Sequence, residues 1–150
     1  MKKFKFSLDS VLSYKQQVLE SLQGEHAAIL AQVREQEGVL ERAWQDYREC
    51  DAEYRQRKAE GITITDAMVY QNGLRVLEND IQRETDKLEE LRRKEEKKRQ
   101  EVVGAKIDTS SIEKLKEKKL DLYNKEAAKS EEVLIDEFVS SARARASIGA

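Results

Sequence analysis

Apolar residues recur at intervals of three and four along the first stretch of the chain, which is the spacing of an α-helical coiled coil. The repeating positions are Leu8, Lys15, Leu22, Ile29, Gln36, Ala43 and Cys50, with a second set four residues further on at Leu12, Leu19, His26, Val33, Leu40, Tyr47 and Tyr54. Only Lys15, Gln36 and His26 interrupt the pattern. The spacing predicts a helix over about residues 8–60.

A second stretch repeats with the same period after residue 66. Its positions are Ala67, Leu74, Ile81, Leu88, Glu95 and Val102, with a partner set at Tyr70, Leu77, Glu84, Leu91, Lys98 and Ala105. Residues 92–99 are all charged and mostly basic, which is typical of a solvated helix surface. This stretch predicts a helix over about residues 66–140, followed by a frayed tail over 141–150.

The segment Gly61-Ile-Thr-Ile-Thr-Asp66 is the clear turn signal in a chain that contains no proline. Gly61 suits a left-handed position at the end of a helix. Thr63, followed three residues later by Asp66, resembles a capping box that starts the next helix. The predicted turn therefore spans residues 61–65. A helical hairpin folded there places residue i beside roughly residue 125 − i.

The predicted fold is all-α: one domain over residues 1–150, built as a long antiparallel two-helix coiled coil with a C-terminal helix overhang. Residues beyond about 118 find no partner in the first helix. A second apolar stripe in a different phase begins at Ile112 and continues into this region, at Ile112, Leu115, Leu122 or Tyr123, Ala127, Val133 or Leu134, and Phe138. Residues 104–111 either continue the second helix, with at most a mild kink, or interrupt it; the lack of proline favours continuity. An unpartnered stripe predicts a partner outside the chain.

The amino-acid composition narrows the classes of function that are expected of this chain. Charged residues make up 39% of the chain and aromatic residues 6%, with a net charge of −2, as expected for long helices rather than for a nucleic-acid-binding surface. The basic run at 92–99 lacks aromatic residues on which bases could stack. A single cysteine leaves no intrachain disulfide and is typical of a cytosolic protein.

Candidate chemistry is sparse. His26 and Cys50 are the lone histidine and the lone cysteine, and both fall on seam positions, where a polar specificity residue and a buried thiol are expected. We therefore expect no catalytic residue, metal site or cofactor. Trp44, Tyr47 and Tyr54 gather with Tyr70 near the turn, and a two-helix seam cannot bury all four. An exposed aromatic surface suited to protein binding is expected there.

The N-terminal segment Phe4-Lys-Phe6-Ser-Leu8-Asp-Ser-Val11-Leu12-Ser-Tyr-Lys15 resembles the FxFxLxxLLxxK start of the bacterial flagellar export protein FliJ family. The resemblance continues over the rest of the chain, at the glycine-marked turn, Tyr70-Gln71 with Leu74 and Leu77, residues 112–119, and Asp136-Glu137-Phe138.

This resemblance implies a non-enzymatic, cytoplasmic component of the flagellar type III export apparatus, similar to the gamma stalk of rotary ATPases and peripheral at the inner face of the cell membrane. The implied partners are the hexameric export ATPase, the cytoplasmic domain of the export gate protein, and export chaperones, but no nucleic acid. The implied gate-side residues are Tyr47, Tyr54, Tyr70, Leu74 and Leu77, with Gly73 interrupting their apolar surface, and the implied ATPase-side residues are Leu122, Leu134 and Phe138. A stalk of a virulence-type export system is a variant of this hypothesis. The alternative is a homo-oligomeric coiled-coil scaffold that self-associates through the overhang.

Overall fold

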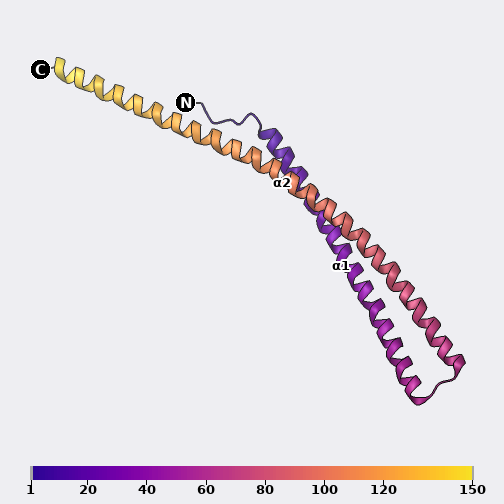
Figure 1. The fold of residues 1–150 in the computed structure, drawn as a ribbon. Helices are drawn as coiled ribbons and strands as arrows, with labels where there is room; N and C mark the ends of the chain where they lie inside the picture. Colours follow the sequence, from indigo (N-terminus) through magenta and orange to yellow (C-terminus); the bar gives the residue numbers. More distant parts are fainter. Residues whose placement is uncertain (1, 150) are drawn as a thin grey trace. The chain divides into compact units, whose positions relative to one another are not determined.

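The computed structural model describes residues 2–149 and contains two helices, α1 (Asp9–Glu60) and α2 (Ile64–Ile148) (Figure 1). The two helices pack antiparallel, so the predicted all-α helical hairpin is confirmed. By their contacts the residues divide into two compact units. Unit 1 consists of residues 1–19 and 104–150, and unit 2 of residues 20–103. The prediction of a single domain over residues 1–150 stays a prediction.

The connection between the helices is tighter than predicted. Gly61 ends α1 with a φ of 102°, in the left-handed region that glycine adopts without a Cβ penalty. The backbone N–H of Asp66 donates to Thr63 Oγ1 at 3.1 Å, so Thr63 caps α2. Ile64 and Thr65 consequently lie in the first turn of α2, and only residues 61–63 connect the helices. The predicted start of the second helix at residue 66 was two residues late.

The predicted heptad positions of both helices face one another in unit 2. The buried apolar side chains of this unit are Val33, Tyr54, Ile81, Leu88 and Val102. The other predicted seam positions between residues 20 and 103 are half-buried. Side chains repeating every seven residues stay on one face of a helix, which explains why the sequence pattern identified the seam.

Polar residues that break the heptad pattern meet one another across the seam. His26 Nε2 hydrogen-bonds Glu95 Oε1 at 2.8 Å. Gln36 Nε2 donates to Glu84 Oε2 at 2.6 Å and to the Glu84 carbonyl oxygen at 3.0 Å. Two of the three breaks in α1, at His26 and Gln36, are therefore each satisfied by a break in α2, and part-buried polar groups that are paired in this way specify register.

The Gln36–Glu84 pair makes stability depend on pH. The hydrogen bond from Gln36 lowers the pKa of the Glu84 carboxyl, and the Lys87 ammonium adds to this effect. A depressed folded-state pKa contributes stability above the unfolded-state pKa, and this contribution is lost as the pH falls through the folded-state value. We expect the urea midpoint of the native protein to fall more steeply than that of Glu84→Gln between neutral and acid pH.

The control for this prediction is Glu35→Gln, which removes an exposed carboxylate on α1. We expect its midpoint to follow the native pH profile. If Glu84→Gln and Glu35→Gln gave the same profile, the Gln36–Glu84 hydrogen bond would not carry the pH dependence.

In unit 1, α2 runs unbroken through residues 104–111, so the continuous alternative is the correct one. Thr109 is buried, and its Oγ1 donates to the Ala105 carbonyl at 2.8 Å and contacts the Lys15 carbonyl at 3.4 Å. Lys116 Nζ lies 2.8 Å from Asp9 Oδ1. Thr109, Lys116 and Tyr123 continue the seven-residue spacing, so the predicted change of phase before Tyr123 is wrong. Because Thr109 and Lys116 are polar, the apolar pattern of the sequence does not show that the seam continues through them.

The N-terminal arm, residues 2–8, packs against α2. Phe6 is buried with 5% of its surface exposed, and the Phe4 and Tyr123 ring centroids lie 5.6 Å apart. The Tyr123 hydroxyl donates to the Lys2 carbonyl oxygen at 2.5 Å. The arm therefore gives α2 an intrachain partner as far as Tyr123, slightly beyond the predicted limit near residue 118.

Beyond Ala127, every described residue is exposed, and α2 continues to Ile148 (Figure 1, yellow). We call residues 128–148 the overhang. The prediction of a frayed tail from residue 141 was wrong because Ala142-Arg-Ala-Arg-Ala146 consists of strong helix formers and the next glycine is Gly149. Neither helix, over the residues described, combines the length and apolar character needed to cross a membrane.

Candidate partner-binding surfaces

The five residues predicted to face the gate lie in the seam of unit 2. Tyr54 is buried, and Tyr47, Tyr70, Leu74 and Leu77 are half-buried. The Tyr54 and Tyr70 rings pack with centroids 5.2 Å apart. These side chains therefore hold α1 and α2 together and present only their edges to a partner.

The two half-buried tyrosines act as hydrogen-bond donors. Tyr47 donates to Glu78 Oε1 at 3.4 Å, and Tyr70 donates to Glu53 Oε1 at 2.9 Å. Partial burial raises the pKa of both phenols, and the neighbouring carboxylates raise it further. Both hydroxyl groups consequently stay protonated at neutral pH and orient their rings along the seam.

In the half of unit 2 nearer the turn, the exposed apolar surface lies beside the seam. Trp44 is 41% exposed and packs edge-on against Tyr47, with ring centroids 6.0 Å apart. It lines a hollow together with Ile81 and Thr85. The predicted exposed aromatic surface is therefore confirmed for Trp44. An ideal Cβ on Gly73 would lie 4.0 Å from Cys50 Sγ, so Gly73 faces α1 and does not interrupt this exposed surface.

Sequence reasoning missed a further group of exposed apolar side chains on the first turns of α2. Its members are Ile64, Met68, Val69 and Val76, each more than half exposed. They fall outside the heptad positions, which is why a search for the seam passed over them. The signal that could have found them is the run Ala67-Met-Val-Tyr70, in which apolar residues occupy more than the two positions that a seam needs.

The three residues predicted to face the ATPase are all exposed on α2, at 59% for Leu122, 63% for Leu134 and 76% for Phe138. Leu134 and Phe138 line one shallow hollow with Ala142 and Arg145. Leu122 precedes Leu134 by twelve residues, which turns it away by about 120° around the helix. The structure thus brings Leu134 and Phe138 together and places Leu122 on a different face.

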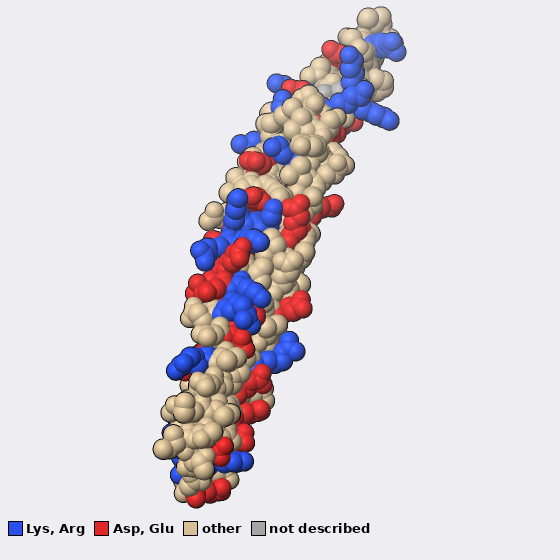
Figure 2. All heavy atoms as spheres, turned by 90° about the vertical axis from the view of Figure 1, so that its right-hand side faces the viewer, with Lys and Arg blue, Asp and Glu red and all other residues tan. Residues whose placement is uncertain are grey.

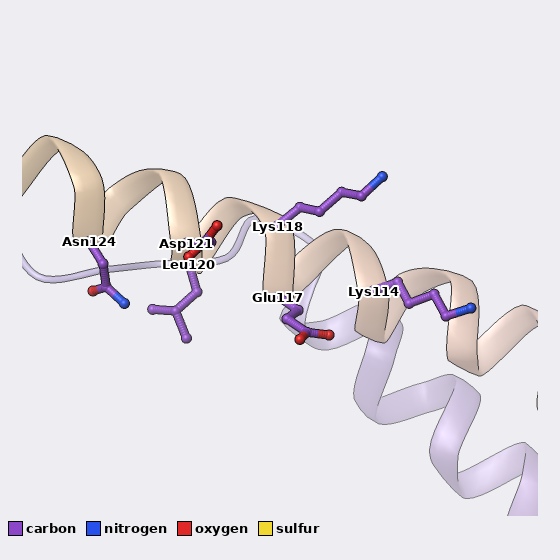
Figure 3. Close-up of a pocket in the computed structure, with 6 residues that line it drawn as sticks. All are labelled: Lys114, Glu117, Lys118, Leu120, Asp121 and Asn124. Carbon is purple, nitrogen blue, oxygen red and sulfur yellow. The ribbon is translucent and has the colours of Figure 1, made fainter.

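A second hollow on α2 lies closer to the arm (Figure 3). Glu117, Leu120 and Asn124 project to one side of the helix, whereas Lys118 extends to the other side in this view. Leu120 is 39% exposed and supplies the apolar surface of the hollow. Lys114, Glu117, Lys118 and Asp121 make the lining of this open recess largely charged.

Charged side chains and potential catalytic or metal-binding side chains are spread along both helices rather than gathered at one site. Basic and acidic side chains alternate along the visible surface in Figure 2. Lys98 Nζ, for example, lies 2.8 Å from Glu25 Oε2 and 2.7 Å from Glu101 Oε2, and these contacts raise its pKa. Within residues 2–149, no three His, Cys, Asp or Glu side chains are grouped to hold a metal ion. His26 and Cys50 lie 24 residues apart on α1, about 36 Å along the helix, so they cannot form a nucleophile–base pair.

Comparison with known families identifies the chain. Residues 4–147 match the family described as the flagellar FliJ protein. The chain belongs to this family. It is thereby assigned to the proteins of flagellar export, and the resemblance of its N-terminal segment is confirmed. No curated protein matches the chain, and no solved structure does.

The FliJ match covers most of the N-terminal arm and nearly all of the overhang. It begins at Phe4 in the arm and ends at Ser147 near the end of the overhang. The arm that packs on Tyr123 and the exposed helix beyond Ala127 therefore both belong to the part of the chain that the FliJ family shares.

Proposed function

We propose that this chain is a non-catalytic stalk and chaperone escort of flagellar type III export, working in the cytoplasm at the inner face of the cell membrane. Its proposed partners are the hexameric export ATPase, the cytoplasmic domain of the export gate protein and the export chaperones. It would reach the membrane only through these partners. The observation that carries the proposal is the overhang, an intact helix whose every side chain is exposed and whose Leu134 and Phe138 share one face.

The dimensions of the overhang suit insertion into a protein ring. Its 21 residues span about 30 Å, and a lone helix with its side chains is about 10–12 Å wide. Leu134 and Phe138 offer an apolar anchor one helical turn apart, and burying such side chains contributes about 1.5–3 kcal/mol each. Insertion would cover surface that the chain itself leaves open to water.

The gate protein is the proposed partner of the exposed apolar side chains in the half of unit 2 nearer the turn, which form two groups, one around Trp44 and one on the first turns of α2. Trp44 and Met68 are better candidates for direct contact than the seam tyrosines, because more than a third of each side chain is exposed. Tyr47, Tyr54, Tyr70, Leu74 and Leu77 would support this surface by holding the helices in register. Aromatic and methionine side chains are favoured at interfaces for their large contact area.

The test is the ATP hydrolysis rate of the export ATPase from the same organism, with and without this chain. We expect the native chain to bind the assembled ATPase and stimulate it. Leu134→Ser combined with Phe138→Ser should weaken binding at least about tenfold, which corresponds to a loss of 1.4 kcal/mol. Because both side chains are exposed, the far-ultraviolet circular dichroism should not change.

The matched control is Val133→Ser, which changes an exposed apolar residue about 100° around the helix from Leu134. Its binding should equal that of the native chain. Leu122→Ser tests the predicted ATPase-side residue that lies on a different face. Unchanged binding by the Leu134 and Phe138 double variant would contradict the assignment of the overhang to the ATPase.

A further inference from the structure

On one face of the overhang and the turn before it, residues at equal distances on either side of Phe138 are complementary in charge and in size. Residues separated by three, four or seven positions share a face of a helix. The residues of this face are Ala127, Glu131, Leu134, Ile135, Phe138, Ser141, Ala142 and Arg145. Glu131 and Arg145 each lie seven residues from Phe138, on opposite sides, and Leu134 and Ala142 each lie four residues from it. Among the ion pairs of residues 2–149, none involves the side chain of Glu131 or of Arg145.

We propose that this face binds a second copy of the same chain, as an antiparallel pair of overhangs centred on Phe138. In such a pair, a residue that precedes Phe138 lies opposite the residue that follows Phe138 by the same number. Glu131 of each copy would therefore meet Arg145 of the other, which gives two equivalent ion pairs. Leu134 would lie opposite Ala142, and a large side chain facing a small one lets two helices approach closely.

The charge pattern selects both the partner and the direction of pairing. A parallel pair would place Glu131 beside Glu131 and Arg145 beside Arg145, and both contacts repel. A helix of another protein that carried charges of one sign would form an ion pair with only one of the two residues, either Glu131 or Arg145. A second copy in antiparallel orientation satisfies both ends and uses the same surface twice, as a two-fold symmetric dimer requires.

The dimer covers the side chains that the chain itself leaves exposed. Leu134, Ile135 and Phe138 are all more than half exposed, and the pairing removes all three from water in each copy. Two short helices bury less area than a permanent dimer does, so the association is reversible and depends on concentration. This inference goes beyond the proposed function, because it requires neither the ATPase nor the gate protein. The dimer covers the Leu134 and Phe138 face that the proposed function assigns to the ATPase, so one overhang makes one of the two contacts at a time.

Sedimentation velocity of the full chain over a concentration series tests the proposal. We expect a reversible monomer–dimer equilibrium. Glu131→Arg should weaken the dimer at least about tenfold, because each Arg145 would then face an arginine. Arg145→Glu should do the same. The double variant Glu131→Arg with Arg145→Glu should restore the dimer, since it exchanges the charges without changing their complementarity.

The matched control is Glu132→Arg, which makes the same change of charge about 100° further around the helix and should leave the dimer intact. The proposal is overturned by a chain that stays monomeric at every concentration. A dimer unaffected by Glu131→Arg, or one that the double charge exchange does not restore, also overturns it, because another surface or an unrelated partner then covers the face. The ATPase is absent from this measurement, so its outcome is independent of the ring-binding test.

Discussion

Replacing Leu88 with alanine is expected to lower the free energy of unfolding of unit 2 by about 2–3 kcal/mol. Leu88 is only 4% exposed, the smallest exposed fraction among the buried apolar side chains of the described residues. Removing a buried leucine side chain loses its transfer free energy and leaves a cavity behind. The lower part of the usual range applies because a seam between two helices closes around a cavity, or admits water to it, more easily than a thick core does.

Urea unfolding followed by far-ultraviolet circular dichroism measures this effect, and amide hydrogen exchange over residues 20–103 assigns it to unit 2. Val76→Ala is the control in the same unit, because Val76 is 58% exposed and its truncation should change stability by less than about 0.5 kcal/mol. Equal losses in the two variants would mean that Leu88 does not occupy the interior of the seam.

The second large effect is expected in unit 1, where Phe6→Ala should release the N-terminal arm. Phe6 is 5% exposed, and truncation of a buried phenylalanine costs about 3 kcal/mol or more. The arm is otherwise held by the Phe4–Tyr123 ring contact and by the Tyr123 hydroxyl on the Lys2 carbonyl. With so few contacts, the arm should detach while α1 and α2 stay folded, as a local opening.

Hydrogen exchange of the Asp9 amide, which donates to the Phe6 carbonyl oxygen at 3.1 Å, and the solvent exposure of Tyr123 report this release. The Asp9 amide should exchange faster in Phe6→Ala, whereas the amides of unit 2 should keep their native rates. Phe6→Leu should restore part of the protection because it refills most of the volume. The control is Lys5→Ala, an exposed change in the same segment. Native protection in Phe6→Ala would show that Phe6 does not anchor the arm.

The polar layers of the seam explain why one register is preferred in unit 2. A shift of one heptad would place His26 opposite Leu88 or Val102 instead of Glu95. Both His26 and Glu95 would then face apolar side chains without a partner, which costs free energy because each is largely shielded from water, with 19% and 20% of their side chains exposed. Apolar seam residues alone do not distinguish such shifts, since leucine packs against leucine in any of them.

The candidate surfaces were only partly predictable because residue type does not determine exposure. Tyr54 and Trp44 are both aromatic and lie close in sequence, yet Tyr54 is buried in the seam and Trp44 is 41% exposed beside it. Leu122 and Leu134 look equivalent in the sequence, but the rotation of the helix between them separates their faces. The exposed Met68 and Val69 escaped notice because the heptad analysis searched for the seam and not for its surroundings.

The sequence by itself determined the two helices, the turn at Gly61, the antiparallel pairing and the existence of the overhang. These features follow from a period repeated over many turns and from one glycine and one cap, which are properties of neighbouring residues. Only the tertiary structure decided that His26 meets Glu95, that Thr109 is buried, and that the arm reaches Tyr123. Such contacts join residues that are 69 to 121 positions apart in the sequence. Their partners are fixed by how the helices meet in space, and no local pattern encodes that.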